Sequence, residues 1–195
     1  MKNTNHSLFD KYEMIKDLGT GSSGSVTLVR HISMDQERAL KKVPKASAFA
    51  ESALSEARLL KSLEHPSIPR IFDFEDDDAF YYIVEEYIDG ETLDSFLLHQ
   101  QLISPGLFFN ICEQLCNVFI YLHTQISTPI IYRDLKPEHI IVCHNKLKLI
   151  DFGVSAYVIQ DGNNFNHYGN IEFSAPECFT EDTITPAADI YSLGQ

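Results

Sequence analysis

The 195-residue sequence has no tryptophan, three methionines, four cysteines and few cations: 15 lysines and arginines stand against 28 aspartates and glutamates, for a net charge of −13. Nucleic acids and anionic membranes bind clustered lysines and arginines, so we expect neither as a partner. No apolar run approaches the roughly 20 residues of a membrane-spanning helix. Residues 1–10 lack the apolar core of a secretory signal, and we therefore expect a cytoplasmic protein.

The four cysteines lack the paired spacing of a metal site. Cys112 and Cys116 lie four residues apart in a predicted helix, and all four are expected to be buried, reduced thiols rather than zinc ligands or disulfides. Seven of the eight histidines lie outside any recognisable motif and are expected at solvated surface positions. The exception is His139, which lies within a motif described below.

Hydrophobic residues make up 44% of the chain, enough for a globular core. Residue patterns predict strands at 14–18, 25–30, 38–43, 68–74 and 80–87, with one helix at 48–63. The acidic residues 75–78 are predicted to be a solvated hairpin tip. Beyond them the patterns predict a helix at 106–123, strands at 140–143 and 147–150, and a helix starting at 185–186. This order predicts an α+β chain with two lobes, residues 1–87 and 88–195.

A glycine-rich turn, G-x-G-x-x-G-x-V, begins at Gly19 and ends at Val26. A dinucleotide-binding turn would lead into a helix, whereas a strand is predicted here. Strand, turn and strand are typical of a flap whose backbone N–H groups lie over phosphates, and glycine permits that close approach. A plain hairpin turn fits this feature equally well.

A lysine on the third predicted strand and a glutamate on the first predicted helix are expected to pair. Lys41 shares a strand face with Ala39 and Val43. Glu56 falls on the apolar face of the helix, where an unpaired carboxylate is costly. Such a pair would hold the ammonium group in place for a phosphate.

The most informative run is Tyr-Arg-Asp-Leu-Lys-Pro-Glu-His at 132–139, followed by Asp-Phe-Gly at 151–153. A carboxylate at Asp134 can accept a proton from an attacking hydroxyl, Lys136 can steady a phosphate, and Asp151 can hold Mg²⁺. The alternative is that the two aspartates are loop residues with unrelated roles. This alternative is disfavoured because two further motifs follow in order, Ala-Pro-Glu at 175–177 and Asp-Ile-Tyr-Ser-Leu-Gly at 189–194.

Taken in order, these motifs resemble the eukaryotic-type (Hanks-type) serine/threonine protein kinases. The resemblance implies a two-lobe kinase fold and ATP-dependent transfer of the γ-phosphoryl group to serine and threonine hydroxyls of a protein substrate. Tyr132 replaces the usual histidine, a form similar to kinases of bacterial type. The implied catalytic residues are Asp134, Lys136, Lys41 and Glu56. The implied ATP-binding residues are Gly19, Thr20, Gly21, Ser22, Ser23, Gly24, Val26, Ala39, Lys41, Glu86, Tyr87 and Ile141, and the implied metal ligands are Asp151 and His139.

Two departures from the family bear on activity. His139 stands where the family has an asparagine that binds a second Mg²⁺. Imidazole suits softer metals, so we expect slow transfer that favours Mn²⁺. The family continues with further helices beyond 189–194, so we expect a C-terminally truncated kinase lobe whose helix at 106–123 needs a covering partner. A pseudokinase, a nucleotide-binding scaffold with little turnover, is the alternative function.

Overall fold

The computed structural model describes residues 7–21, 24–100, 102–158, 170–180 and 184–195. The chain divides into two compact units. The first contains residues 1–64 and 69–87, and the second contains residues 65–68 and 88–195.

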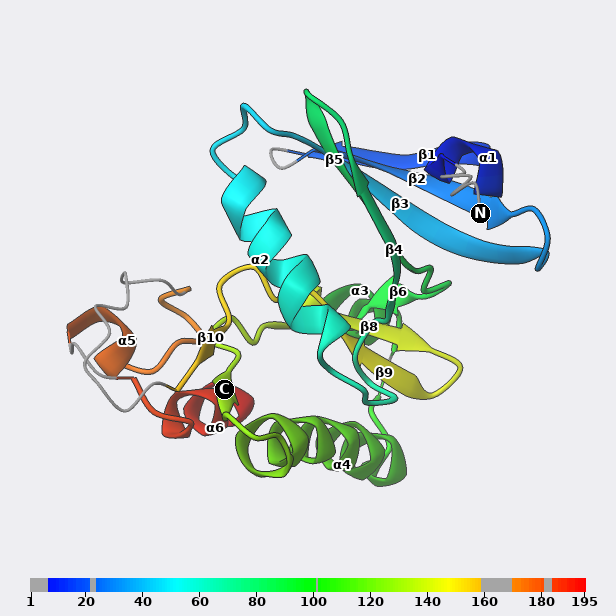
Figure 1. Cartoon of the computed structure of the whole chain (residues 1–195). Coiled ribbons are helices and arrows are strands. Elements are labelled where there is room, and N and C mark those ends of the chain that lie inside the picture. Colours follow the sequence, from blue (N-terminus) through cyan, green and yellow to red (C-terminus); the bar gives the residue numbers. More distant parts are fainter. Residues whose placement is uncertain (1–6, 22–23, 101, 159–169, 181–183) are drawn as a thin grey trace. The chain divides into compact units, whose positions relative to one another are not determined.

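The first unit is built on an antiparallel five-stranded sheet with strand order β1-β2-β3-β5-β4 (Figure 1). Its elements are α1 (Leu8–Lys11), β1 (Tyr12–Gly21), β2 (Gly24–His31), β3 (Gln36–Pro44), α2 (Ala50–Lys61), β4 (Ile71–Asp76) and β5 (Phe80–Glu86). The strands predicted at 14–18, 25–30, 38–43 and 80–87 and the helix predicted at 48–63 are confirmed within a few residues.

Apolar clusters cover both faces of this sheet, because alternate residues of a strand point to opposite faces. On one face, Leu40 packs with Leu8, at the start of α1, and with other buried side chains. On the opposite face, Val43 packs with Ala53 of α2 and with Ile83. Lys41 lies two residues before Val43 on β3 and therefore shares the face that α2 covers.

The predicted strand at 68–74 begins too early in the sequence. β4 starts only at Ile71, and Ile68 is 1% exposed within the second unit. There the Ser67 carbonyl accepts a 2.8 Å hydrogen bond from the Leu149 N–H, and the Lys148 ammonium lies 3.4 Å from the Ile68 carbonyl. The apolar side chain of Ile68 therefore fills a buried position in this turn and does not extend β4.

The acidic run at 75–78 is more than a solvated hairpin tip. The Glu75 carboxylate accepts the Leu8 N–H at 2.5 Å, and Asp76 pairs with Lys45 at 2.5 Å. Asp77 accepts the N–H groups of Ala79 and Phe80, at 2.8 and 2.7 Å, and the Tyr82 hydroxyl at 2.9 Å. These hydrogen bonds lower the pKa of Asp77. The run therefore anchors α1 and shapes the hairpin.

The second unit combines helices with short strands (Figure 1). Its elements are β6 (Glu91–Thr92), α3 (Leu93–His99), α4 (Pro105–Ile120), η1 (Tyr121–Gln125), β7 (Ile130–Ile131), η2 (Pro137–His139), β8 (Ile140–Cys143), β9 (Lys146–Leu149), β10 (Ala156–Tyr157), α5 (Glu177–Thr180) and α6 (Ala187–Leu193). Two small sheets form, β6-β8-β9 and β10-β7. The Ser104 hydroxyl accepts the Leu107 N–H at 3.2 Å and caps α4.

The hairpin between β8 and β9 turns through two residues with left-handed backbone angles, His144 (φ 49°) and Asn145 (φ 63°). Positive φ at both central residues is typical of a tight hairpin that follows the twist of its strands. The hairpin predicted between 140–143 and 147–150 is therefore confirmed, with β9 starting one residue earlier.

The cysteines and several histidines differ from expectation, since His31 and His65 are half-buried rather than exposed. Cys178 is buried, and burial raises the pKa of its thiol, but Cys116 is exposed and two others are half-buried. None of the four, all within the described ranges, forms a disulfide. His123 is not on the surface either, since its side chain is 10% exposed. Among the described helices, none is long and apolar enough to cross a membrane.

Candidate active site

The glycine-rich turn joins β1 and β2, which pair so that Gly19 lies opposite Val26 and Gly21 opposite Gly24. The predicted strand, turn and strand are thus confirmed; Ser22 and Ser23 lie outside the described residues. A side chain at Gly24 would meet the Lys42 carbonyl oxygen at 2.1 Å, and its φ of 146° is unfavourable for other residues. Glycine is therefore required there by the approach of β3.

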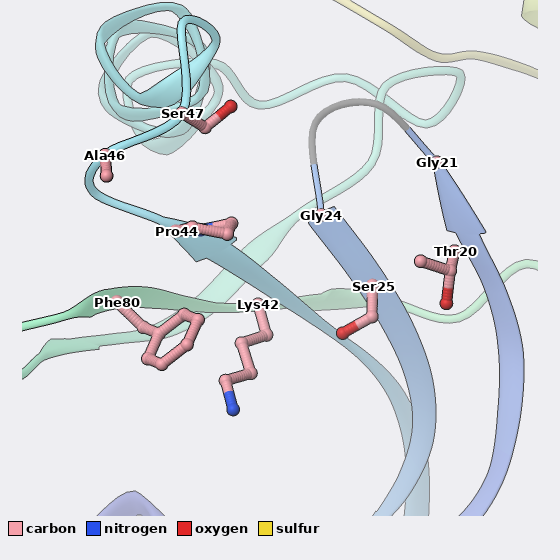
Figure 2. A pocket seen from close by; sticks show the side chains of 9 residues that line it. All are labelled: Thr20, Gly21, Gly24, Ser25, Lys42, Pro44, Ala46, Ser47 and Phe80. Atoms are coloured by element: carbon pink, nitrogen blue, oxygen red, sulfur yellow. The ribbon is translucent and has the colours of Figure 1, made fainter.

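A hollow of about 530 Å³ lies beside this turn, and Figure 2 shows the nine residues that line it. The lysine that lines it is Lys42, whose ammonium nitrogen lies 4.0 Å from the centre of the Phe80 ring. Lys41 and Lys42 are adjacent in β3, so they point to opposite faces of the sheet. The hollow therefore lies on the face away from Lys41, although three of the predicted ATP-binding residues, Thr20, Gly21 and Gly24, line it.

The predicted pair of Lys41 and Glu56 is confirmed. The Lys41 ammonium lies 2.9 Å from Glu56 Oε2, and the side chains are 21% and 11% exposed. α2 presents Glu56 on the same face as Ala53 and Ala57, which are both buried against the sheet. A lysine held in this way keeps a fixed positive charge at the face of β3.

The residues predicted to hold adenine are divided between the two units. In the first, Val26 pairs with Lys41 across the sheet, and Ala39 is 7% exposed. At the end of β5, the Glu86 N–H donates to the Arg70 carbonyl at 2.9 Å. Tyr87, the last residue of the first unit, is half-buried. Ser25, which pairs with Thr20 across the two strands of the turn, is also half-buried. In the second unit, Ile141 of β8 is half-buried as well. Their contact with adenine stays a prediction.

The loop between β7 and β8 brings several charged groups together in the second unit. The Lys136 ammonium lies 3.4 Å from Asp134 Oδ2. His139, on η2, lies with Nδ1 3.3 Å from Asp134 Oδ2 and Nε2 3.5 Å from Asp151 Oδ2. Asp151 directly follows β9 and Ile150, and its side chain is 55% exposed. The four residues of this unit that were predicted to act in catalysis or metal binding therefore meet at one place.

A buried carboxylate holds this loop from α6. Asp189 is 0% exposed, and it accepts the N–H groups of Tyr132 and Arg133 at 2.9 and 2.8 Å. His123 Nε2 donates to the same carboxylate at 2.8 Å. This role of His123 was not predicted from the sequence, although His123 lies four residues after Phe119, which is 1% exposed on the same helical face.

Two residues of this loop region have strained backbones. Arg133 has a φ of 71° and Asp151 a φ of 61°, in the left-handed region that favours glycine. Arg133 Nε donates to the Val154 carbonyl at 2.6 Å, which ties the loop to the segment after Asp151. The Tyr132 and Phe152 rings pack edge to face with their centres 5.1 Å apart. Strain of this kind, held by surrounding contacts, is typical of functional sites.

Residues 12–195 match the family model described as the protein kinase domain. The chain belongs to the protein kinase family. The sheet-based unit and the mainly helical unit are the two lobes of this kinase fold, so the predicted α+β class is confirmed.

Several curated kinases are similar to this kinase chain. It is 31% identical over 193 residues to the serine/threonine-protein kinase PrkC of Bacillus subtilis, covering 94% of this chain. It is 34% identical over 185 residues to the serine/threonine-protein kinase ppk25 of Schizosaccharomyces pombe, covering 92% of this chain, and 28% identical over 200 residues to PknB of Mycobacterium tuberculosis, covering 96%. The chain spans 29%, 43% and 32% of the length of these three relatives.

The donor atoms of this kinase site suit a divalent cation. Asp151 offers half-exposed carboxylate oxygens, the ligands that Mg²⁺ prefers. Within the described ranges, no three histidine, cysteine, aspartate or glutamate side chains gather as a metal site. A cation at Asp151 would therefore depend on water or phosphate oxygens for its remaining ligands, as magnesium usually does at nucleotide sites.

Proposed function

We propose that this kinase domain transfers the γ-phosphoryl group of ATP to serine or threonine hydroxyls of a protein substrate. The observation that carries the proposal is the cluster on the loop after β7, where Asp134 contacts both Lys136 and His139, and His139 also contacts Asp151. Membership of the protein kinase family supports it. Serine/threonine specificity is supported by Lys136, two residues after Asp134, and by the names of the relatives.

The roles of the residues follow from their charge and surroundings. Asp134 accepts the proton of the attacking hydroxyl, and Lys136 neutralises the transferred phosphoryl group. Lys41, steadied by Glu56, binds the α- and β-phosphates of ATP. A divalent cation held by Asp151 would neutralise charge on the phosphate oxygens. The transfer is direct and in line, because positioning and charge neutralisation supply most of the rate enhancement.

The adenine base is proposed to lie against Val26, Ala39 and Ile141, with its edge toward the backbone of Glu86 and Tyr87. The glycine turn from Gly19 to Gly24, with Thr20, Ser22 and Ser23, would lie over the phosphates through its N–H groups. The strand pairing of the turn supports this role. An ATP-dependent enzyme whose four cysteines form no disulfide is expected in the cytoplasm.

A polypeptide partner on α4 remains part of the proposal. Phe108 and Phe109 are 53% and 68% exposed, and Ile120 is 48% exposed. Exposed apolar side chains of this size favour coverage by another apolar surface.

A pseudokinase is the second candidate, and His139 favours it. Its ring occupies the space between Asp134 and Asp151, where the family resemblance calls for an asparagine. An imidazole is a poorer ligand for Mg²⁺ than an amide oxygen. Such a protein would bind ATP and be stabilised by it without transferring phosphate.

The test is transfer of radiolabelled phosphate from ATP to a generic basic protein by the wild type and by Asp151→Asn. We expect the substitution to lower the transfer rate by about 10²–10⁴-fold, because the cation would lose its carboxylate ligand. Asp35→Asn is the matched control, since Asp35 is 85% exposed, and should transfer at the wild-type rate.

Thermal unfolding with and without ATP separates the two candidates. Stabilisation by ATP without transfer, in Mg²⁺ and in Mn²⁺, would select the pseudokinase. Transfer that survives Asp151→Asn unchanged would contradict the proposed site.

A further inference from the structure

Side chains from four strands of the first unit meet at the hollow beside the glycine-rich turn. Ser25 of β2 lies opposite Thr20 of β1 and opposite Lys42 of β3, and residues that pair across an antiparallel sheet point to the same face. Pro44 of β3 lies opposite Phe80 of β5 in the same way. Lys42 and Pro44 are two residues apart in β3, so all five side chains share one face of the sheet (Figure 2).

This face is opposite to the one that is proposed to hold ATP. Val26 pairs with Lys41, and each lies one residue along its strand from Ser25 or Lys42, so this second pair points the other way. The face of Lys41 is also the face that α2 covers. The hollow of about 530 Å³ therefore shares the glycine-rich turn with the proposed ATP site but contains a different lysine.

The charge of Lys42 is not neutralised within the hollow. Its ammonium nitrogen lies 4.0 Å from the centre of the Phe80 ring and 5.9 Å from the centre of the Tyr82 ring, and aromatic faces of this kind hold a cation in place. Among the described residues Lys42 forms no ion pair, whereas Lys11 and Lys45 each pair with an aspartate. None of the nine lining residues is acidic. In a chain with a net charge of −13, the hollow therefore offers a positive charge to an anion from solution.

The donor groups and the size of the hollow indicate what kind of anion fits. The Lys42 ammonium and the hydroxyls of Ser25 and Thr20 are three hydrogen-bond donors, and a phosphate monoester carries three strong acceptor oxygens. Pro44 and Phe80 add an apolar wall. Pockets for small organic molecules have volumes of about 300–1,000 Å³, so the hollow has room for an organic group beside the phosphate.

We propose that this hollow binds an organic phosphate monoester. The phosphate group lies at Lys42, Ser25 and Thr20, and the organic group lies against Phe80 and Pro44. The ligand would contact the glycine-rich turn from the face opposite to the proposed ATP site. The inference does not depend on the proposed transfer reaction, because every residue that carries it belongs to the first unit and none of them is a predicted catalytic residue.

The test uses the full chain with phenyl phosphate as the probe, and binding is measured by isothermal titration calorimetry. Lys42→Met should lower the affinity about tenfold or more, because it removes a charged donor to a charged acceptor. Ser25→Ala keeps the ammonium group and should lower the affinity about two- to tenfold. Lys16→Met is the matched control, since Lys16 is an exposed lysine of β1 outside the hollow, and should bind as tightly as the wild type.

Lys41→Met separates the hollow from the proposed nucleotide site. Because Lys41 points to the opposite face of the sheet, this variant should keep the wild-type affinity for phenyl phosphate. Binding that is lost in Lys41→Met and kept in Lys42→Met would overturn the inference. Transfer of phosphate from ATP is measured separately, so a failure of the proposed function would leave this result unchanged.

Three further results would overturn the inference: no binding of phenyl phosphate to the wild type, equally tight binding of inorganic phosphate, or unchanged affinity in Ser25→Ala. A phosphoserine peptide added in competition identifies the source of the phosphate. Displacement of phenyl phosphate would support a site for a phosphorylated protein segment. Binding of phenyl phosphate that the peptide does not displace would support a site for a small phosphate ester.

Discussion

Asp189 shows how one buried side chain can position a catalytic loop. Its fully buried carboxylate accepts two backbone N–H groups, from Tyr132 and Arg133, and the ring N–H of His123. Hydrogen bonds to a charged acceptor are worth roughly 1.5–3 kcal/mol each. These hydrogen bonds fix the backbone of Tyr132 and Arg133, and Asp134 is the next residue. The position of the Asp134 backbone is therefore fixed as well. The strained φ of 71° at Arg133 is sustained by the same bonds.

His65 makes stability depend on pH. Its Nδ1 accepts the Ser67 N–H at 3.1 Å, and its ring lies 5.1 Å from that of Tyr121. Burial, and secondarily the charge of Lys148, lowers the pKa of His65 below its ordinary 6.5. As pH falls below about 6.5, the unfolded chain therefore binds a proton before the folded chain does, and the free energy of unfolding falls until the folded-state pKa is passed.

His65→Asn should remove this part of the pH dependence, because the asparagine side chain can still accept the Ser67 N–H but does not titrate near neutrality. The measurement is urea unfolding of both proteins between pH 7.5 and pH 5. We expect the variant to lose less free energy of unfolding than the wild type over that range. Parallel curves would show that His65 does not contribute.

Single residues differ in how far the sequence could predict them. The pairing of Lys41 with Glu56 was predictable, because helical periodicity alone puts a carboxylate on a buried face and a cation must meet it. The pairing of His123 with Asp189 was not, since 66 residues separate them. Nothing in the local pattern of His123 indicates a buried acceptor.

Among the strands, the contact between β2 and β3 depends on Gly24. In Gly24→Ala the new methyl group would lie 2.1 Å from the Lys42 carbonyl oxygen and 3.2 Å from the Val43 Cα, and backbone atoms cannot move aside as a flexible side chain can. The φ of 146° adds strain. We expect a loss of about 1–3 kcal/mol in the free energy of unfolding, measured with urea.

Gly21→Ala is the matched control for this substitution. Gly21 lies opposite Gly24 in the same turn, and a methyl group there would meet nothing within 4 Å. It should cost no more than about 0.5 kcal/mol. Equal losses in the two variants would contradict the close approach of β3 to Gly24.

Secondary-structure elements were predictable where their patterns are long and regular, as in β2, β3, β5 and α4. The start of β4 was not, because Ile68 is as apolar as a strand residue but is buried in a turn of the second unit. α1 has only four residues and depends on distant partners, Glu75 for its first N–H and Asp73 for Lys11, at 2.5 and 2.7 Å. Local propensity cannot reveal an element that tertiary contacts hold.

For the molecule as a whole, the functional groups are divided between two units. Lys41 and Glu56 belong to the first unit, and Asp134, Lys136 and Asp151 belong to the second. Each group is held within its own unit, by an ion pair in the first and by the loop contacts of Asp189 in the second. The proposed transfer requires both groups to act on one ATP molecule.

A double-mutant cycle on kcat/KM for phosphate transfer tests that requirement most directly, with Lys41→Met, Asp151→Asn and the double variant. If both residues act on the same triphosphate, each single substitution lowers kcat/KM by about 10²–10⁴-fold, and the double variant is about as slow as the slower single variant. Losses that multiply, or single variants that keep wild-type activity, would contradict a shared nucleotide.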